Sequence, residues 1–207
     1  VKEAGEQRAD LDRLRATAYR AFDLVLAPSR FLIDELVRGG FERERIEYAP
    51  LGFDNADLAA LPPVRREPGR AVRFAFLGGL GKHKGVHVLL DAFARLSGGA
   101  ELCVWGGSSD QSYVERLRHR CGEVGAQWRG VYERPELPQI LASVDALVVP
   151  SIWVENYPLV IHEGFAARRP VLASRLGALP ESVQDGVNGL LFAPGDGRFH
   201  MIYAGAL

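Results

Sequence analysis

The sequence predicts an α/β protein built on a doubly wound, Rossmann-like parallel sheet. From residue 71 to residue 194, short apolar runs alternate with segments in which apolar residues recur three and four positions apart. The runs are typical of buried strands and the periodic segments of helices. Because strands that alternate with helices are joined by right-handed crossovers, the strands should be parallel and the helices should cover both faces of the sheet. With 207 residues, 47% of them hydrophobic, the chain can bury such a core without a disulfide or a metal.

A smaller group of elements is expected before the alternation begins. In order they are a helix over 5–20, a buried strand over 22–27, a helix over 29–38 and a short strand over 45–50. Ser29 has the side chain of an N-cap, and the two glycines after residue 38 should end the same helix. Residues 53–70 are rich in proline and arginine and lack a sustained period, which indicates a linker.

The alternating region contains six expected strands and five expected helices. The strands are expected over 71–78, 100–107, 126–131, 145–151, 170–174 and 188–194, and the helices over 84–96, 110–123, 136–143, 158–169 and 179–186. Ligands of such sheets bind at the carboxyl ends of the strands. The loops in which a site is expected are therefore 78–85, 106–110, 131–135, 150–158 and 175–180.

Composition and charge exclude several classes of protein. A net charge of −1 gives no basic footprint for nucleic acid, and no run approaches the roughly 18 apolar residues of a membrane span. Cys103 and Cys121 are too few for a disulfide framework and lack the spacing of metal ligands, so both are expected to be small buried side chains. The start of the chain has neither a secretory leader nor an initiator methionine, and we expect a cytoplasmic protein of which this chain is a part.

The loop from Gly78 to Gly85 combines glycines with two of the chain's three lysines, Lys82 and Lys84. Glycines let a backbone approach a ligand closely, and lysines at the start of a helix can neutralise phosphate. A dinucleotide-binding fingerprint would need glycine in place of Lys84, and a P-loop would need serine or threonine after it; neither is present. A phosphate-binding role is favoured over a tight turn with solvated lysines, because lysine is otherwise almost absent.

The loop after the fourth expected strand leads into a helix whose first turn holds Pro158. The start of this helix offers the free amides of Leu159 and Val160, and the positive end of the helix dipole, to an anion. Glu155 lies in the loop just before it, and Glu163 lies a turn and a half inside. Two carboxylates beside an anion site suit the hydroxyl groups of a sugar nucleotide. The alternative for each glutamate is a helix cap or a solvated helical side chain.

Three segments together resemble a known family. They are GGLGKHKGVHVLLDAFARL (78–96), the Glu-x7-Glu pair in ENYPLVIHE (155–163) and GALPESVQDGVNGLLFAPGD (177–196). Their order and spacing are similar to those in the C-terminal half of a GT-B glycosyltransferase, of the large retaining family usually called family 4. Upstream, DLVLAPSRFLIDEL and IEYAPLGFD resemble the end of that family's N-terminal domain and its hinge, so the resemblance covers roughly residues 22–196.

The resemblance implies that the ligand is a nucleotide-diphosphate sugar. Glu163 would hold the ribose hydroxyls, and Glu155 would face the donor sugar and steady its hydroxyls or the cationic ring. Lys84, with the amides of Leu159 and Val160, would hold the diphosphate and stabilise the departing charge. Glu155 and Lys84 are thus the expected catalytic residues.

The resemblance also assigns the remaining contacts of the nucleotide sugar. The loop at Val131 and Tyr132 would lie by the base, and Gly79, Lys82 and Asn156 complete the expected site. Gly79 stands where the family usually has an arginine that binds the diphosphate, and Lys82 is the candidate replacement cation. None of the five histidines matches the family's donor-proximal histidine, which comes from the N-terminal domain.

By the same resemblance the chain would be the donor-binding part of an enzyme of hexosyltransferase type. It would transfer a sugar with retention to an acceptor hydroxyl in polysaccharide or glycoconjugate synthesis. Residues 1–52 would be the tail end of the acceptor domain, 53–70 a linker and 71–207 the nucleotide-sugar-binding domain, and the chain alone should be inactive. No cofactor and no metal are implied. A GT-B phosphorylase or epimerase, and a non-catalytic sugar-nucleotide-binding or scaffold domain, stay open as alternatives.

The expected partners are a nucleotide-sugar donor and an acceptor with a hydroxyl group, and not a nucleic acid. Arginines at positions 8, 13, 15 and 20 could contact the anionic inner face of a membrane, although a solvated helix face also accounts for them. The N-terminal strands offer edges through which two copies of the chain could pair as a homodimer.

Overall fold

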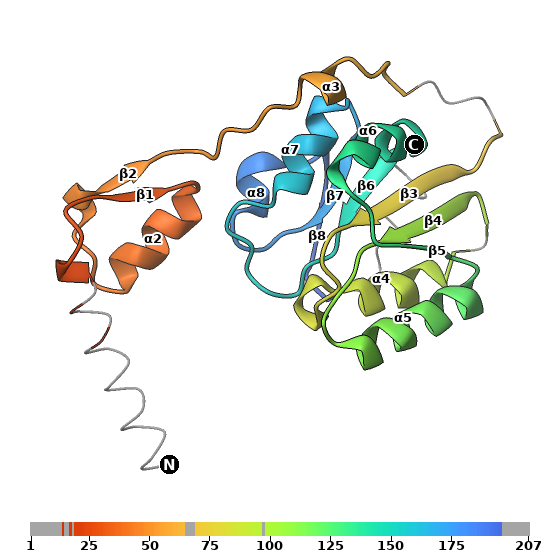
Figure 1. Ribbon diagram of the computed structural model, residues 1–207, viewed down its shortest axis with the longest axis horizontal. Coiled ribbons are helices and arrows are strands. Elements are labelled where there is room, and N and C mark those ends of the chain that lie inside the picture. The colour runs from red at the N-terminus through yellow and green to blue at the C-terminus, as the bar shows by residue number, and fades with distance from the viewer. Residues whose placement is uncertain (1–13, 15–16, 18, 65–68, 97, 196–207) are drawn as a thin grey trace, which may run out of the picture. The chain divides into compact units, whose positions relative to one another are not determined.

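The computed structural model describes residues 14, 17, 19–64, 69–96 and 98–195 (Figure 1). The chain divides into two compact units, residues 1–52 and residues 53–207. Most of the helix expected over 5–20 lies outside the described residues, and so does the end of the chain after residue 195. We describe each unit by itself.

The first unit is a β-α-β arrangement. Its elements are β1 (Val25–Ala27), α2 (Arg30–Arg38), η1 (Arg43–Arg45) and β2 (Ile46–Tyr48). The two strands pair in parallel, and α2 connects them. The Ser29 hydroxyl accepts a hydrogen bond from the Leu32 amide at 3.1 Å, so the expected N-cap is confirmed.

One expectation for the first unit is wrong. The apolar run 22–27 was expected to be a buried strand, but only its last three residues form β1, and Leu24 and Leu26 are 48% and 60% exposed. The small core of this unit consists of Ala27, Ile33, Phe41 and Ile46. One complete helix, α2, is described in this unit, and a single helix can cover only one face of a two-stranded sheet. The residues on the other face therefore remain in solvent.

The second unit is a six-stranded sheet in which every described strand pair is parallel. Its strands are β3 (Val72–Leu77), β4 (Ala100–Trp105), β5 (Gln127–Gly130), β6 (Ala146–Val149), β7 (Val171–Ser174) and β8 (Gly189–Phe192). They lie in the order β5-β4-β3-β6-β7-β8. The chain therefore builds outward from β3 in one direction and from β6 in the other. This doubly wound order confirms the expected fold class and puts the topological switch point between β3 and β6.

Helices cover both faces of this sheet. They are η2 (Lys82–Lys84), α4 (Val86–Phe93), α5 (Gln111–Val124), η3 (Arg134–Glu136), α6 (Leu137–Ala142), α7 (Leu159–Ala166) and α8 (Leu179–Ser182). In Figure 1, α4 and α5 lie together on one side of the strands. Side chains of β3 alternate between two cores: Phe74 packs with α4 and α5, whereas Ala75 packs with α6 and α7. This period of two is what a strand buried on both faces requires.

The segment expected to be a linker is ordered over much of its length. It contains a short helix, α3 (Ala56–Ala59), whose Leu58 is fully buried in the core shared with α6 and α7. Arg168 donates to the Leu61 carbonyl at 2.7 Å, and Arg169 donates to the Pro62 carbonyl at 3.1 Å. Tertiary contacts therefore hold this segment on the second unit. The described part of 53–70 differs in this respect from a free linker.

Both cysteines are buried and unpaired, as expected. Cys121 is fully buried in the core under α5, and this burial raises the pKa of its thiol to about 11. Across the described part of the chain, no helix is both long and apolar enough to cross a membrane.

Candidate functional site

Two loops meet at the switch point of the sheet. One follows β3 and runs from Gly78 to Gly85, and the other follows β6. The Ile152 amide of the second loop donates to the His83 carbonyl of the first at 2.9 Å. Gly85 has a φ of +71°, and a Cβ there would lie 2.0 Å from the Pro150 carbonyl oxygen. Only glycine allows this approach, so the glycine-rich loop is fixed against the loop that carries Glu155.

A third loop holds Glu155 from the other side. The Ala178 amide, in the loop after β7, donates to the Glu155 carbonyl at 2.9 Å. Gly177 has a φ of +57°, and a Cβ there would lie 2.6 Å from the same carbonyl oxygen. Gly177 and Ala178, at the start of the segment 177–196, thus hold the backbone of Glu155 in place.

The side chains of Lys84 and Glu155 form an ion pair at this junction. Lys84 Nζ lies 2.7 Å from Glu155 Oε1, and the Ser151 hydroxyl donates to the same oxygen at 2.6 Å. The two charged side chains are 30% and 14% exposed, so water screens their interaction only in part. An ammonium group has three donors and Glu155 takes one of them, which leaves Lys84 able to donate to an anion as well. Sequence reasoning predicted both charged residues but missed Ser151, whose position four residues before Glu155 carries no recognisable signal.

Helix α7 begins immediately after this loop. Its N-cap is Pro158, which makes no side-chain hydrogen bond to the first turn. The first-turn amides of Leu159 and Val160 therefore stay available to an anion, together with the positive end of the helix dipole. Leu159 is 43% exposed, so this end of the helix is open to solvent.

Glu163 lies on α7 in a second, mixed-charge cluster. Burial raises the pKa of its carboxyl, while the nearby Arg134 guanidinium lowers it and Asp57 raises it. Burial also raises the pKa of Tyr132, and the charge of Glu163 adds to that effect. Arg134 in turn forms two hydrogen bonds with the Asp57 carboxylate, of 2.9 and 3.1 Å. The structure thus groups Glu163 with the loop of Tyr132, as expected. Arg134 and Asp57, 77 residues apart in the sequence, were not predicted.

The other expected site residues are more exposed. Val131 is 72% exposed at the end of β5, and Asn156 is exposed beside Glu155. Gly79 is exposed too, and an added Cβ would meet nothing within 4 Å. Lys82 lines a pocket of about 460 Å³ between α4 and α5 together with Tyr113 and Arg116. The structure therefore brings Lys84 to Glu155 but turns Lys82 toward a different pocket.

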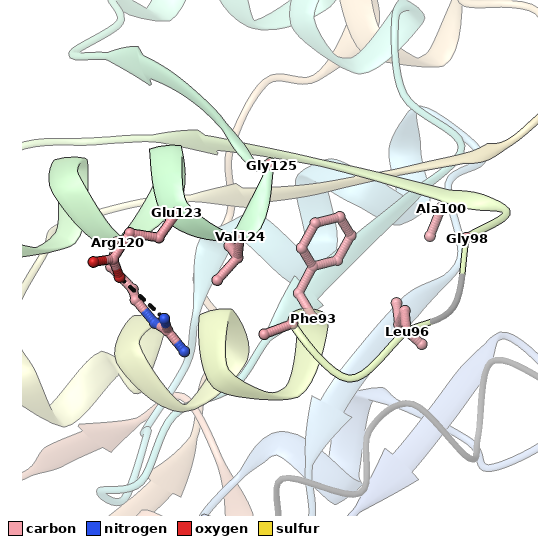
Figure 2. A pocket seen from close by; sticks show the side chains of 9 residues that line it. Phe93, Leu96, Gly98, Ala100, Arg120, Glu123, Val124 and Gly125 are labelled. Atoms are coloured by element: carbon pink, nitrogen blue, oxygen red, sulfur yellow. Dashed lines mark hydrogen bonds and ion pairs between the residues drawn. The ribbon is translucent and has the colours of Figure 1, made fainter.

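A further pocket lies outside the candidate site. It has a volume of about 400 Å³ and lies where the end of α4 faces the end of α5, with Arg120 and Glu123 paired at 3.0 Å along its wall (Figure 2). Ala100, the first residue of β4, also lines it. The pocket is thus at the amino ends of the strands, opposite to the loops that carry Lys84 and Glu155. No cluster of three or more potential metal-ligating His, Cys, Asp or Glu side chains occurs among the described residues.

Comparison with known sequences points to one family. A model of the family described as glycosyl transferases group 1 matches residues 71–202. The D-inositol 3-phosphate glycosyltransferase of Corynebacterium efficiens is 35% identical over 173 residues, which cover 73% of this chain and 40% of that protein. The α-maltose-1-phosphate synthase of Mycolicibacterium smegmatis is 28% identical over 195 residues, which cover 84% of this chain and 49% of that protein. The chain thus spans less than half of the length of either relative.

A solved structure has the same architecture. The Anabaena protein Alr3699/HepE in complex with UDP is 25% identical and superposes with a TM-score of 0.73. The match covers 85% of this chain and 51% of that one. The likeness agrees with the Rossmann-like sheet that the strand order shows.

Proposed function

Because the chain belongs to the glycosyl transferases group 1 family, whose GT-B fold it shares, we propose that it is the donor-binding part of a retaining glycosyltransferase. In this proposal the chain is the C-terminal half of a family 4 enzyme. The full-length enzyme moves a hexose from a nucleotide-diphosphate sugar to an acceptor hydroxyl in polysaccharide or glycoconjugate synthesis. One observation supports it most: the Lys84–Glu155 pair lies at the switch point, directly before the uncapped start of α7.

The site offers the charges that a departing nucleoside diphosphate needs. The Lys84 ammonium and the amides of Leu159 and Val160 would bind the diphosphate and stabilise the negative charge that grows on it as the glycosidic bond breaks. These donors are in place before the reaction, so little reorganisation is needed. The proposal therefore requires neither a metal nor a cofactor.

Binding of a diphosphate also changes the state of Glu155. In the free protein its carboxylate is neutralised by Lys84 at 2.7 Å. When Lys84 donates to phosphate, Glu155 keeps a negative charge that can accept hydrogen bonds from the sugar hydroxyls and offset positive charge on the sugar ring. Ser151 then holds the carboxylate in place through the hydrogen bond of 2.6 Å.

Glu163 would accept hydrogen bonds from the ribose hydroxyls, with Val131 and Tyr132 beside the base. Gly79, Lys82 and Asn156 complete the proposed site. The complex of the Anabaena relative with UDP supports a nucleotide as the ligand and makes uridine the first base to test. As for setting and partners, we propose a cytoplasmic protein that can lie at the inner face of a membrane.

A second candidate is a non-catalytic sugar-nucleotide-binding or scaffold domain. It is favoured by the exposed glycine at position 79 and by the position of Lys82 in the lining of the α4–α5 pocket. Among the described residues, Lys84 is then the lysine that pairs with Glu155.

Thermal-shift measurements with UDP, GDP, ADP, CDP and the corresponding sugar nucleotides test the proposal. We expect one nucleotide family to raise the melting temperature in a concentration-dependent manner, since a ligand that binds only the native state stabilises it. A chain that no member of the panel stabilises would favour the scaffold and contradict a donor site. If Glu155→Gln and Glu163→Gln leave the ligand-induced rise in melting temperature unchanged, the ligand binds at a different site.

A further inference from the structure

The loop that carries Glu155 is attached to α7 by a pair of aromatic rings. Tyr157 is the residue before the N-cap Pro158, and His162 is the fourth residue of the helix. Their rings stack with centroids 4.3 Å apart and planes 12° apart. Contact between these two positions is the geometry of the hydrophobic staple, which fixes the direction in which a chain enters a helix.

The staple is held from two more sides. The ring of Phe53 lies 5.8 Å from the ring of His162 at an angle of 58°, and the Ser182 hydroxyl on α8 lies 3.5 Å from His162 Nε2. Burial lowers the pKa of His162, so at neutral pH the ring is uncharged and can replace the apolar residue of an ordinary staple. His162 thus contacts the loop before α7, the helix α8 and the start of the second unit.

This arrangement bears on Glu155, which lies two residues before Tyr157. The backbone of Glu155 is already held on one side by the Ala178 amide at 2.9 Å. On the other side the chain passes through Asn156 to Tyr157, whose ring has His162 as its stacking partner. The Glu155 side chain is also held by Lys84 and Ser151, so without the stack the segment from Glu155 to Pro158 would lose the contact that fixes its entry into α7 and keep its others. Its side chains would then sample more conformations, at an entropic cost on binding.

We propose that His162 is a positioning residue for the donor sugar: by stacking on Tyr157 it fixes the direction in which the Glu155 loop enters α7. The inference rests on the proposed function, in which Glu155 faces the sugar. It assigns a role to a histidine that has no contact with Lys84 or Glu155 in the described residues. The affinity for the sugar part of the ligand should depend on the ring at position 162, whereas the affinity for the nucleoside diphosphate should depend on it much less.

Calorimetric titration of UDP and UDP-glucose, or of the equivalent pair that the nucleotide panel selects, separates these two affinities. His162→Leu removes the flat ring, and His162→Phe keeps a flat ring without its nitrogens. His119→Leu is the matched control, because His119 lies on α5 with its side chain 79% exposed. Ser182→Ala tests the contact with α8. Glu155→Gln shows how much of the preference for UDP-glucose over UDP depends on Glu155.

We expect His162→Leu to lower the affinity for UDP-glucose about tenfold and that for UDP by less than about twofold, the difference corresponding to roughly 1 kcal/mol. His162→Phe should restore most of the loss, and His119→Leu should bind like the wild type. An unchanged affinity of His162→Leu for UDP-glucose, an equal loss for both ligands, or a failure of phenylalanine to restore binding would overturn the proposal.

The same titrations separate this inference from the proposed function. If the wild type binds UDP and UDP-glucose equally and Glu155→Gln changes neither affinity, the sugar role of Glu155 fails, and the role of His162 fails with it. If Glu155→Gln abolishes the preference and His162→Leu keeps it, only the role of His162 fails. Should His162→Leu not fold, Tyr157→Leu removes the other ring of the staple and is expected to show the same selective loss.

Discussion

Burial of Glu163 favours its neutral form, whereas its proposed role in binding requires the ionised carboxylate. Burial raises its pKa, so its ionised form is less favoured in the free protein than that of an ordinary glutamate. In the proposed function, ribose hydroxyls would bind the ionised form, and each charge-assisted hydrogen bond contributes about 1.5–3 kcal/mol. We therefore expect Glu163→Gln to weaken UDP binding about 10- to 100-fold at neutral pH. Calorimetry of wild type and variant measures this.

The pH dependence provides a second readout of the same residue. Wild-type affinity should be full above the raised pKa of Glu163 and should decline as the pH falls through it, whereas Glu163→Gln should lack this decline. The melting temperature of the variant at neutral pH should equal or exceed that of the wild type, since a desolvated charge has been removed. Equal affinity of the two proteins for UDP at neutral pH would show that the ribose is held elsewhere.

Lys84 is expected to act on the diphosphate and not on the nucleoside. Lys84→Ala should reduce the affinity for UDP far more than that for uridine, and the loss should shrink at high salt because ions screen the charge. Lys82→Ala is the matched comparison, since Lys82 lines the α4–α5 pocket and is expected to contribute less. Titration of both ligands at two salt concentrations decides the matter. Equal losses for UDP and uridine would mean that Lys84 does not contact phosphate.

At the level of elements, the sequence predicts the second unit well because its local and global preferences agree. All six strands and all five helices expected between residues 71 and 194 are present, most of them a few residues shorter than the apolar runs. The helix α3 could not be predicted, because four residues give almost no periodic signal and its stability comes from Leu58 and from distant arginines. The exposure of β1 could not be predicted either, because its apolar composition gives a clear strand signal. Such a composition suits a strand covered on both faces, whereas among the described elements only α2 and β2 lie against β1.

The same reasoning applies to the site. Glu155, Lys84 and Glu163 stand in motifs and could be predicted. Ser151 and the Tyr157–His162 stack lie within a few residues of Glu155 but belong to no motif of the resemblance, whereas the contact of Arg134 with Asp57 joins segments that are distant in the sequence. Spacing in the sequence does not encode such contacts. It also could not show that Lys82 lines the pocket between α4 and α5 while Lys84 pairs with Glu155, because the position of each side chain depends on the turn of η2.

The attachment of the α3 segment gives a prediction about stability. Arg169 is 3% exposed and donates to the carbonyls of Leu141, Ala167 and Pro62 at 2.7, 3.0 and 3.1 Å. Arg169→Met would leave the buried carbonyls of Leu141 and Ala167 without this donor, each at a cost of about 1–3 kcal/mol, so the free energy of unfolding should fall by at least about 2 kcal/mol. Denaturant unfolding measures it.

The neighbouring residue serves as the control. Arg168 is exposed and has a φ of +55°, in the left-handed region that favours glycine. Arg168→Gly loses one hydrogen bond, to the Leu61 carbonyl, but relieves the backbone, so it should change stability by less than about 1 kcal/mol. If Arg169→Met were as stable as Arg168→Gly, the buried guanidinium would not be what holds the segment.

At the level of the whole molecule, the exposed face of the first unit gives a prediction about association. Phe22, Leu24 and Leu26 are 55%, 48% and 60% exposed, and the edges of a two-stranded sheet are open to pairing. We expect concentration-dependent self-association in sedimentation experiments, reduced by Leu26→Glu. A chain that stays monomeric at high concentration would show that these exposed apolar side chains do not cause self-association.

The final prediction is that the chain binds a donor but does not transfer its sugar. Lys84, Glu155 and Glu163, the residues proposed to bind the donor, all lie in the second unit, so we expect this unit to bind a nucleotide sugar by itself. Transfer also requires the acceptor hydroxyl to be held against the anomeric carbon, and positioning of this kind supplies roughly 7–11 kcal/mol of the barrier reduction. The first unit contributes only two described strands and one complete described helix, and the chain spans 40% and 49% of the two curated relatives. A radiolabelled-donor assay should therefore show binding without turnover, and turnover once the chain carries the N-terminal acceptor domain that the proposed function requires. Turnover by the present chain at the rate of the longer one would put the acceptor site in this half and contradict the two-domain argument.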